Sequence, residues 1–164
     1  MIDVESIKND LELLDSEYNK DDVTTELQII YSKMALLSLC CWIEDAFDEI
    51  VKCYIAKQAL TKDIQKYIID KCVEQNYGFN YMKNIIPMFC STIGIANWSS
   101  IQNSVDNVED FKSILNNLSK KRNIIAHKYK SEVMPNYDAP STIINNFQTV
   151  KETICKIESA MNKL

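Results

Sequence analysis

The sequence predicts an all-α fold: one domain over residues 1–164, built as an up-and-down bundle of five to six helices with one long helix. Glycine and proline are scarce, with two and three in 164 residues. Most of the turn residues that a many-stranded sheet needs are therefore missing. Apolar residues recur at helical spacing along most of the chain. A content of 46% hydrophobic and 25% charged residues is typical of a soluble globular domain.

The N-terminal part of the sequence predicts two helices of unequal length. A short helix is expected over residues 6–19, before the acidic turn 20–22. The longest helical pattern runs from about 24 to 60, with apolar residues at steps of three, four and seven. At 1.5 Å per residue, such a helix would be roughly 50 Å long. That length exceeds what a small domain needs for its own core, and it suggests a partner helix or a dimer.

A third helix is expected after Thr61, which is a suitable N-cap residue. Its apolar face comprises Ile64, Tyr67, Ile68 and Cys72. The pair Tyr77 and Gly78 breaks this pattern, because glycine is a strong helix terminator. The third helix is therefore expected to end before residue 77.

The next segment, 80–93, is less regular but has the composition of a helix. Pro87 should begin or kink this helix, since proline lacks a backbone N–H and clashes with the preceding turn. Gly94 should end it, because glycine adopts the backbone conformations that close helices. Trp98 is then expected to anchor a loop.

Two helices are expected in the C-terminal part of the chain. Asp106 or Asn107 should start the first, and Glu109 stands three residues after Asp106, as in a capping box. The apolar stripe of this helix is Val108, Phe111, Ile114, Leu115, Leu118 and Ile125. A polar loop is expected over 131–138, and Pro140 suits the first turn of the last helix.

The charge of the chain restricts the kind of partner it can bind. A net charge of −5 argues against a protein covered in basic surface for sequence-independent nucleic-acid binding. Any site for an anion must therefore be local. The first ten residues are polar and acidic, and no window approaches 18 uninterrupted apolar residues. A cytoplasmic protein without a membrane anchor is expected.

The six cysteines lie within apolar helical patterns and form no C-x-x-C pair. No histidine stands near them to complete a zinc site. We therefore expect reduced thiols that mostly act as small core residues, and no metal or other cofactor. The cysteines are Cys40, Cys41, Cys53, Cys72, Cys90 and Cys155.

The most informative feature of the sequence is a pair of single residues. Arg122 is the only arginine among 18 basic residues, and His127 is the only histidine. When lysine supplies all other positive charge, a lone arginine suggests a need for its planar fork and permanent charge. Chance is the simpler explanation of the same count.

Arg122 falls within the apolar stripe of its helix, four residues after Leu118 and three before Ile125. A guanidinium that faces the interior needs an anionic or carbonyl partner, because burial of an unpaired charge is costly. One interpretation is an intramolecular ion pair with Glu44, on a flank of the long helix. Such a pair would not exclude a functional role.

His127 lies about 140° around an ideal helix from Arg122, because five steps of 100° do not return to the same face. Either the helix loosens at its C-terminal end, or two copies of it pack so that both motifs share one groove. Asn123, one turn before His127, is expected to position the imidazole.

Four lysines surround these residues: Lys120, Lys121, Lys128 and Lys130. They are candidates for RNA binding, since lysine side chains contact phosphate groups. An alternative is that they only complement the helix dipole, because cations are favoured in the last turn of any helix.

An imidazole beside a fixed cation has the chemistry needed to cleave RNA at the 2′-hydroxyl group. Histidine, with an ordinary pKa of about 6.5, accepts the hydroxyl proton, and arginine stabilises the charge that develops on the phosphate oxygens. A second copy of His127 would protonate the departing 5′-oxygen. No metal is required, and DNA would not be cut in this way.

The segment from Arg122 to Tyr129 resembles the R-x4-H-x-Y motif of the HEPN superfamily of small helical bundles. The residue after the arginine is polar in that family, as Asn123 is here. The long helix with Glu44 also resembles the second helix of HEPN proteins, which makes Glu44 a candidate supporting acid.

The resemblance implies a metal-independent endoribonuclease that acts as a homodimer, with Arg122 and His127 as the catalytic pair. Such proteins serve as toxins of toxin–antitoxin pairs or as antiviral effectors. It also implies that Tyr129 is the residue to which a nucleotidyltransferase-type antitoxin would attach AMP. Simple packing of Tyr129 is the alternative.

Two other functions remain open at this stage. One is a catalytically silent HEPN dimer that binds a partner protein or a nucleotide, which the acidic net charge favours slightly. The other is a structural bundle without a site, which leaves the arginine in the apolar stripe unexplained.

Overall fold

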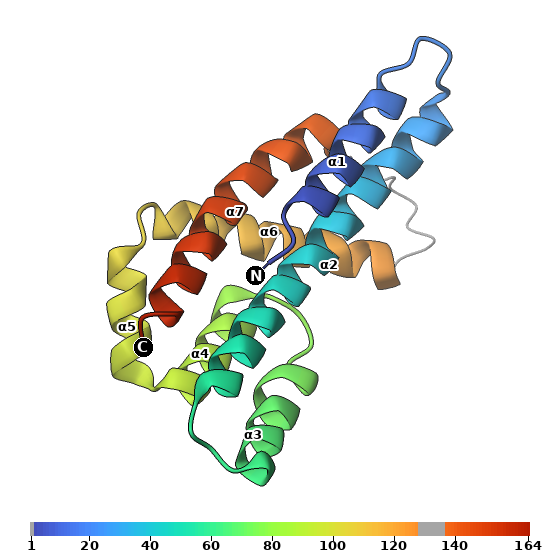
Figure 1. Ribbon diagram of the computed structural model, residues 1–164. Coiled ribbons are helices and arrows are strands. Elements are labelled where there is room, and N and C mark those ends of the chain that lie inside the picture. Colours follow the sequence, from blue (N-terminus) through green and yellow to red (C-terminus); the bar gives the residue numbers. More distant parts are fainter. Residues whose placement is uncertain (1, 128–136) are drawn as a thin grey trace.

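The computed structural model describes residues 2–127 and 137–164, and it confirms the all-α fold with one long helix (Figure 1). Helix α1 (Glu5–Tyr18) and helix α2 (Thr25–Lys57) form an antiparallel hairpin. Thr24 caps α2, where its side chain accepts a hydrogen bond of 3.3 Å from the Leu27 N–H. The ends of both helices lie within three residues of the positions expected from the sequence.

Two further helices complete the body of the bundle. Helix α7 (Pro140–Met161) packs against α1 and α2, and helix α6 (Val108–His127) packs against α2 and α7. In Figure 1, α1, α2 and α7 run side by side and α6 crosses them. Pro140 lies in the first turn of α7, as expected.

The remaining elements gather at one end of the long helix (Figure 1). Helix α3 (Lys62–Ile69) continues into a π-helical turn, η1 (Asp70–Glu74). A second π-helical turn, η2 (Tyr81–Ile85), leads into α4 (Ile86–Ile93), which contacts α5 (Ile95–Ser104). Single π-helical turns often occur at functional sites.

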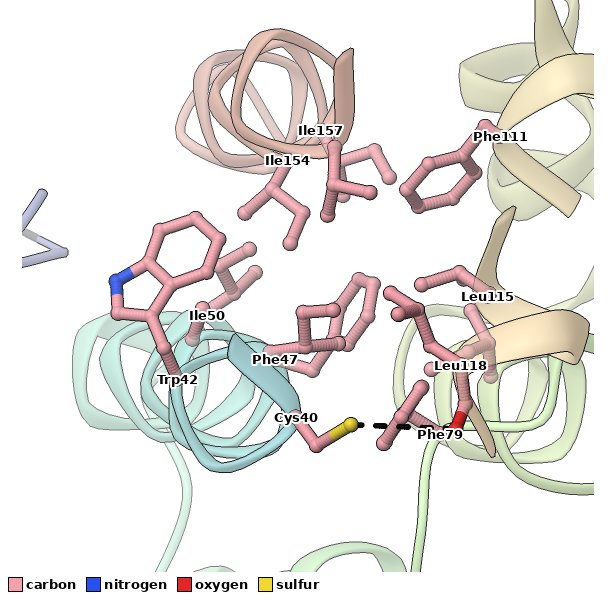
Figure 2. Close-up of a cluster of buried hydrophobic side chains, with 14 of the residues drawn as sticks. Cys40, Trp42, Phe47, Ile50, Phe79, Phe111, Leu115, Leu118, Ile154 and Ile157 are labelled. Carbon is pink, nitrogen blue, oxygen red and sulfur yellow. Dashed lines mark hydrogen bonds between the residues drawn. The ribbon is translucent and has the colours of Figure 1, made fainter. Parts of the chain in front are cut away.

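The core lies between α2, α6 and α7, as Figure 2 shows in cross-section. Aromatic rings occupy its centre and meet edge to face: Phe47 lies 6.4 Å from Phe111 and 5.8 Å from Phe89. Trp42 contacts Phe147 of α7 at 5.2 Å. Edge-to-face packing of this kind adds to the stability that apolar burial provides.

Three expectations about this end of the chain are corrected. Trp98 does not anchor a loop: it lies within α5 and stacks on Phe89 at 4.5 Å. Gly94, with a φ of 84°, ends α4 and starts α5, so one expected loop is a helix. The described residues hold seven α-helices for this reason, more than the five or six expected. The expected capping box does not form among the described residues, where the Glu109 side chain pairs with Lys112 and the Asp106 side chain pairs with Lys156.

The cysteines divide by environment. Cys40 and Cys72 are buried, three are half-buried, and Cys41 is exposed on α2. The Cys40 thiol points toward the Leu118 carbonyl of α6 (Figure 2), at 4.0 Å. Burial raises the pKa of Cys40 to about 12.

Helix α2 is also the one described element that is long and apolar enough to cross a membrane, by length and composition alone. The same test is passed by the core helix of a soluble protein. Buried residues recur along α2 from Ser32 to Ile55, where it packs against the other helices.

Candidate functional site

Arg122 lies where the buried face of α6 gives way to solvent. Leu118, one turn earlier, is buried in the core, and Ile125 packs against the core from its edge. The Arg122 side chain retains 35% of its exposure. The helix thus places the chain's lone guanidinium at the boundary of the core, as the apolar stripe predicted.

The partner of Arg122 is Glu44 of α2, and the Nη2 and Oε2 atoms are 3.2 Å apart. The second oxygen of this carboxylate, Oε1, is buried without a hydrogen-bond partner. Burial raises the pKa of Glu44, while the positive charge of Arg122 opposes that rise. The intramolecular pair considered from the sequence is therefore present.

An acidic cavity of about 250 Å³ opens on one side of this pair. Glu44, Asp45 and Asp48 contribute from α2, and Glu74 contributes from η1. Burial raises the pKa of Asp48 to about 6, with the neighbouring Asp45 and Glu44 adding to the rise. Within the part of the chain that the structure describes, Arg122 is the only basic residue that lines this cavity.

A second cavity, of about 390 Å³, also includes Arg122 in its lining but has the opposite character. Among the described residues, its lining contains three basic side chains, four amide side chains and no carboxylate. We call it the amide cavity. Its residues are Tyr77, Gly78, Asn80, Lys83, Asn84, Asn116, Ser119, Lys120, Arg122 and Asn123.

Helix α6 supplies half of this lining, and four of its five residues share one face. Asn116, Ser119, Lys120 and Asn123 follow each other at spacings of three and four residues, so they form a polar stripe along the helix. By the same periodicity, position 127 lies on this face. The polar stripe therefore leads toward the end of α6, where the lone histidine stands.

The opposite wall is a network of amide hydrogen bonds. Asn80 donates through Nδ2 to Asn116 Oδ1 at 2.9 Å, which connects the start of η2 to α6. The Asn80 Oδ1 atom caps η2 by accepting from the Lys83 N–H at 3.0 Å. Asn84 donates to Asn76 Oδ1 at 3.0 Å and to the Tyr77 carbonyl at 3.1 Å.

His127 is the last residue of α6, and the helix stays regular up to it. Loosening of the helix before His127, one of the two expected ways to bring the motif together, is therefore absent. The orientation of the His127 side chain lies outside what the structure describes. Positions 122 and 127 remain about 140° apart.

The other expected site residues separate into groups. Lys120 and Asn123 are exposed and line the amide cavity with Arg122. Lys121 does not: it pairs with Asp138, near the start of α7. Lys128, Tyr129 and Lys130 lie outside the described residues, so their predicted roles remain predictions.

The sequence analysis missed Tyr77, Lys83, Asn80 and Asn116 as residues of this site. Asn80 and Asn116 are 36 positions apart and meet only because η2 packs against α6. The clearest signal in the sequence was the run of asparagines at 76, 80 and 84, which lies beside the break at Tyr77 and Gly78.

A metal site is not evident in the described part of the chain, where no group of three or more histidine, cysteine or carboxylate side chains could hold an ion. The site instead contains the guanidinium of Arg122, which is paired with Glu44 and lines both the acidic cavity and the amide cavity. Such a guanidinium can contact phosphate oxygens while its partner carboxylate holds it in place.

Comparison with known proteins gives one match. Neither a curated protein nor a solved structure is similar enough to match the chain. The RiboL-PSP-HEPN family model, in contrast, matches residues 2–163. The match covers every helix described above, including α2 and α6, which carry Glu44 and Arg122. The chain is therefore a member of the RiboL-PSP-HEPN family.

Proposed function

We propose that this protein is a metal-independent endoribonuclease that cleaves RNA by attack of a 2′-hydroxyl group. The observation that carries the proposal is the position of Arg122. It is half-buried, paired with Glu44 at 3.2 Å, and lines a cavity of cations and amides in a chain of net charge −5. Membership of a HEPN family supports assigning the catalytic pair to Arg122 and His127.

In the proposed reaction, the 2′-oxygen bonds to phosphorus while the bond from phosphorus to the 5′-oxygen breaks. His127 accepts the proton from the 2′-hydroxyl group, and the departing 5′-oxygen receives a proton from His127 of a second copy. Arg122 stabilises the negative charge that develops on the phosphate oxygens. The products are a 2′,3′-cyclic phosphate and a 5′-hydroxyl group, so no water, metal or oxidant is consumed.

Glu44 acts in this scheme as a positioning residue. Its Oε2 atom holds one nitrogen of the guanidinium and leaves the rest of the fork for phosphate. Asn123, exposed on the face that leads to position 127, is proposed to orient the His127 ring. Lys120, Lys128 and Lys130 are proposed to bind the RNA strand, and Lys121 contributes less because Asp138 already pairs with it.

A homodimer is part of the proposal, because one helix alone presents positions 122 and 127 on different faces. Helix α2 carries an apolar stripe that a second copy would cover: Leu27, Ile30 and Met34 are 40%, 46% and 49% exposed. Leu37 and the exposed Cys41 continue it. This alternation of three and four residues is that of a two-stranded helical seam. The apolar stripe ends at Glu44, which pairs with Arg122.

The biological role we propose is that of a toxin or an antiviral effector, as for other ribonucleases of the superfamily. A nucleotidyltransferase-type antitoxin would silence it by attaching AMP to Tyr129. Mass measurement of the peptide that contains Tyr129, after co-expression with a companion nucleotidyltransferase, tests that modification. An unmodified peptide would remove the antitoxin from the proposal and leave the ribonuclease intact.

The proposed activity is tested by incubating purified protein with total RNA in EDTA. We expect cleavage by the parent protein and by Lys62→Ala, a variant of an exposed cation at the start of α3, and none by Arg122→Ala or His127→Ala. The absence of cleavage by the parent, or cleavage that survives both changes, would contradict the proposal. The remaining interpretation would then be a silent HEPN dimer that binds a protein or a nucleotide.

A further inference from the structure

The amide cavity is lined by basic and amide side chains, which suit a ligand rich in hydrogen-bond acceptors. Three of its lining residues are basic and none is acidic, although the chain contains 23 carboxylate residues. Its volume of about 390 Å³ lies within the range of about 300–1,000 Å³ that ligand pockets occupy.

The hydrogen bonds around the cavity leave several donor groups to the solvent. Asn116 Oδ1 already accepts from Asn80 and from the Tyr81 N–H. The Asn116 Nδ2 group and the ammonium groups of Lys83 and Lys120 have no partner among the described residues. These three groups project from two walls, η2 and α6, toward one space.

Tyr77 stands at the edge of this space, and its ring is 85% exposed. Its carbonyl is fixed by Asn84 Nδ2, and Gly78 follows with a φ of 108°, which favours glycine. The backbone that carries the ring is therefore held in place, while the ring itself contacts little of the protein. An exposed ring beside unpaired cations is the arrangement used to stack a base and bind its phosphate.

We propose that the amide cavity binds one nucleotide of a single-stranded RNA, with its base stacked on Tyr77 and its phosphate held by Lys83 and Lys120. This inference rests on the proposed ribonuclease function, for which it names the strand-binding subsite. The polar stripe of α6 connects the subsite to position 127, so a bound strand would continue toward the reacting phosphate. The Asn116 amide adds a donor for the ribose or the base.

The experiment measures binding separately from cleavage. A fluorescein-labelled RNA of ten nucleotides, 2′-O-methylated throughout, cannot be cut by 2′-hydroxyl attack, and its affinity is read by fluorescence anisotropy in EDTA. We expect Tyr77→Ala to weaken binding about ten-fold, because stacking on an aromatic ring contributes that much. Tyr77→Trp, which keeps a stacking face, should restore binding.

The role of Lys83 is tested through the dependence of RNA affinity on salt concentration. Lys83→Gln should reduce the slope of log affinity against log salt by about 0.7, which is the value for one phosphate contact to a single strand. A residue with only a structural role would not change this slope. Tyr67→Ala and Lys66→Gln are the matched controls, because both residues are exposed on α3 outside the cavity. Both controls should bind as the parent does.

Three results would overturn the inference. The first is parental affinity in Tyr77→Ala, and the second is an unchanged salt slope in Lys83→Gln. The third is binding of AMP as tight as that of the RNA, which would identify a site for a free nucleotide. Binding without cleavage of ordinary RNA would instead refute only the proposed catalysis, so the two failures can be told apart.

Discussion

Arg122 of α6 and Glu44 of α2 form an ion pair that joins two helices across 78 positions of the chain, with 3.2 Å between Nη2 and Oε2. Arg122 lines two cavities of opposite character, one acidic and one lined by cations and amides, and Tyr77 and Gly78 also line both. The second oxygen of Glu44 is buried without a partner, so the contact with Arg122 is the one that compensates burial of this carboxylate. Glu44, a residue of another helix, therefore orients the guanidinium of Arg122.

Replacing Arg122 by lysine tests whether the planar fork of arginine is needed. Lysine keeps the positive charge, but it cannot contact Glu44 and a phosphate in the same bidentate manner. We expect Arg122→Lys to fold as the parent does and to cleave RNA about 100-fold more slowly, the loss typical of removing a transition-state donor. Circular dichroism and single-turnover cleavage in EDTA measure the two effects. Cleavage within a few-fold of the parent would show that charge alone suffices.

Asp48 should make stability depend on pH. Its pKa of about 6 exceeds the ordinary value of 3.8, so the folded chain holds the proton more firmly than the unfolded chain. Stability from this group is therefore lost as pH rises from about 4 through 6. We expect Asp48→Asn to be more stable than the parent by roughly 1 kcal/mol at pH 7.5, after allowing for solvent screening.

Urea unfolding at pH 4 and pH 7.5, followed by tryptophan fluorescence, measures this difference. The advantage of Asp48→Asn should shrink at the lower pH, where the parent carboxyl is protonated. Asp21→Asn, in the exposed turn before α2, is the control and should show no such change. An advantage of equal size at both pH values would contradict the assignment.

Two adjacent cysteines should differ strongly in reactivity. Cys41 is exposed, whereas Cys40 is buried and burial raises its pKa to about 12. Because the thiolate is the reactive form, iodoacetamide at pH 8 should alkylate Cys41 at least 100-fold faster than Cys40 in the Met34→Lys variant, in which no second copy covers Cys41. Peptide mass spectrometry over time separates the two sites, and unfolding in urea should equalise them. Equal rates in the folded protein would contradict the packing of α2 against α6.

The apolar stripe of α2 should control dimer formation. Met34→Lys places a charge in the stripe, and we expect it to convert a homodimer into a monomer of 18.9 kDa. Ile64→Lys changes an equally exposed residue of α3 and should leave the dimer intact. Light scattering after gel filtration gives both masses. A monomeric parent, or a dimeric Met34→Lys variant, would refute this interface.

Helix positions were predictable from the sequence where local signals agreed. Thr24 caps α2, Pro140 opens α7 and Gly94 ends α4, and each acts through backbone geometry within a few residues. Trp98 was misplaced because the same glycine also starts a helix, and a buried aromatic ring stabilises that helix from another part of the chain. The stacking on Phe89 cannot be recognised from local spacing.

The part of the candidate site that lies on α6 was predictable from the sequence, whereas the wall that faces α6 was not. Arg122 stood out as a lone residue type within an apolar stripe, and that position called for an anionic or carbonyl partner, of which Glu44 was one candidate. The amide wall depends on Asn80 meeting Asn116 across two elements, which follows from packing rather than from periodicity. Tyr77 likewise becomes a candidate site residue only because it lines a cavity, which local sequence does not indicate.

The central claim is attack by a 2′-hydroxyl group, and one substitution in the substrate tests it most directly. Once a cleavage site has been mapped in an RNA oligonucleotide, the same oligonucleotide is made with a single 2′-deoxyribose at the nucleotide before the cut. In EDTA we expect the all-RNA strand to yield a 2′,3′-cyclic phosphate and a 5′-hydroxyl end, and the substituted strand to stay intact at that site. Cleavage of the substituted strand at the same position would contradict attack by the 2′-hydroxyl group.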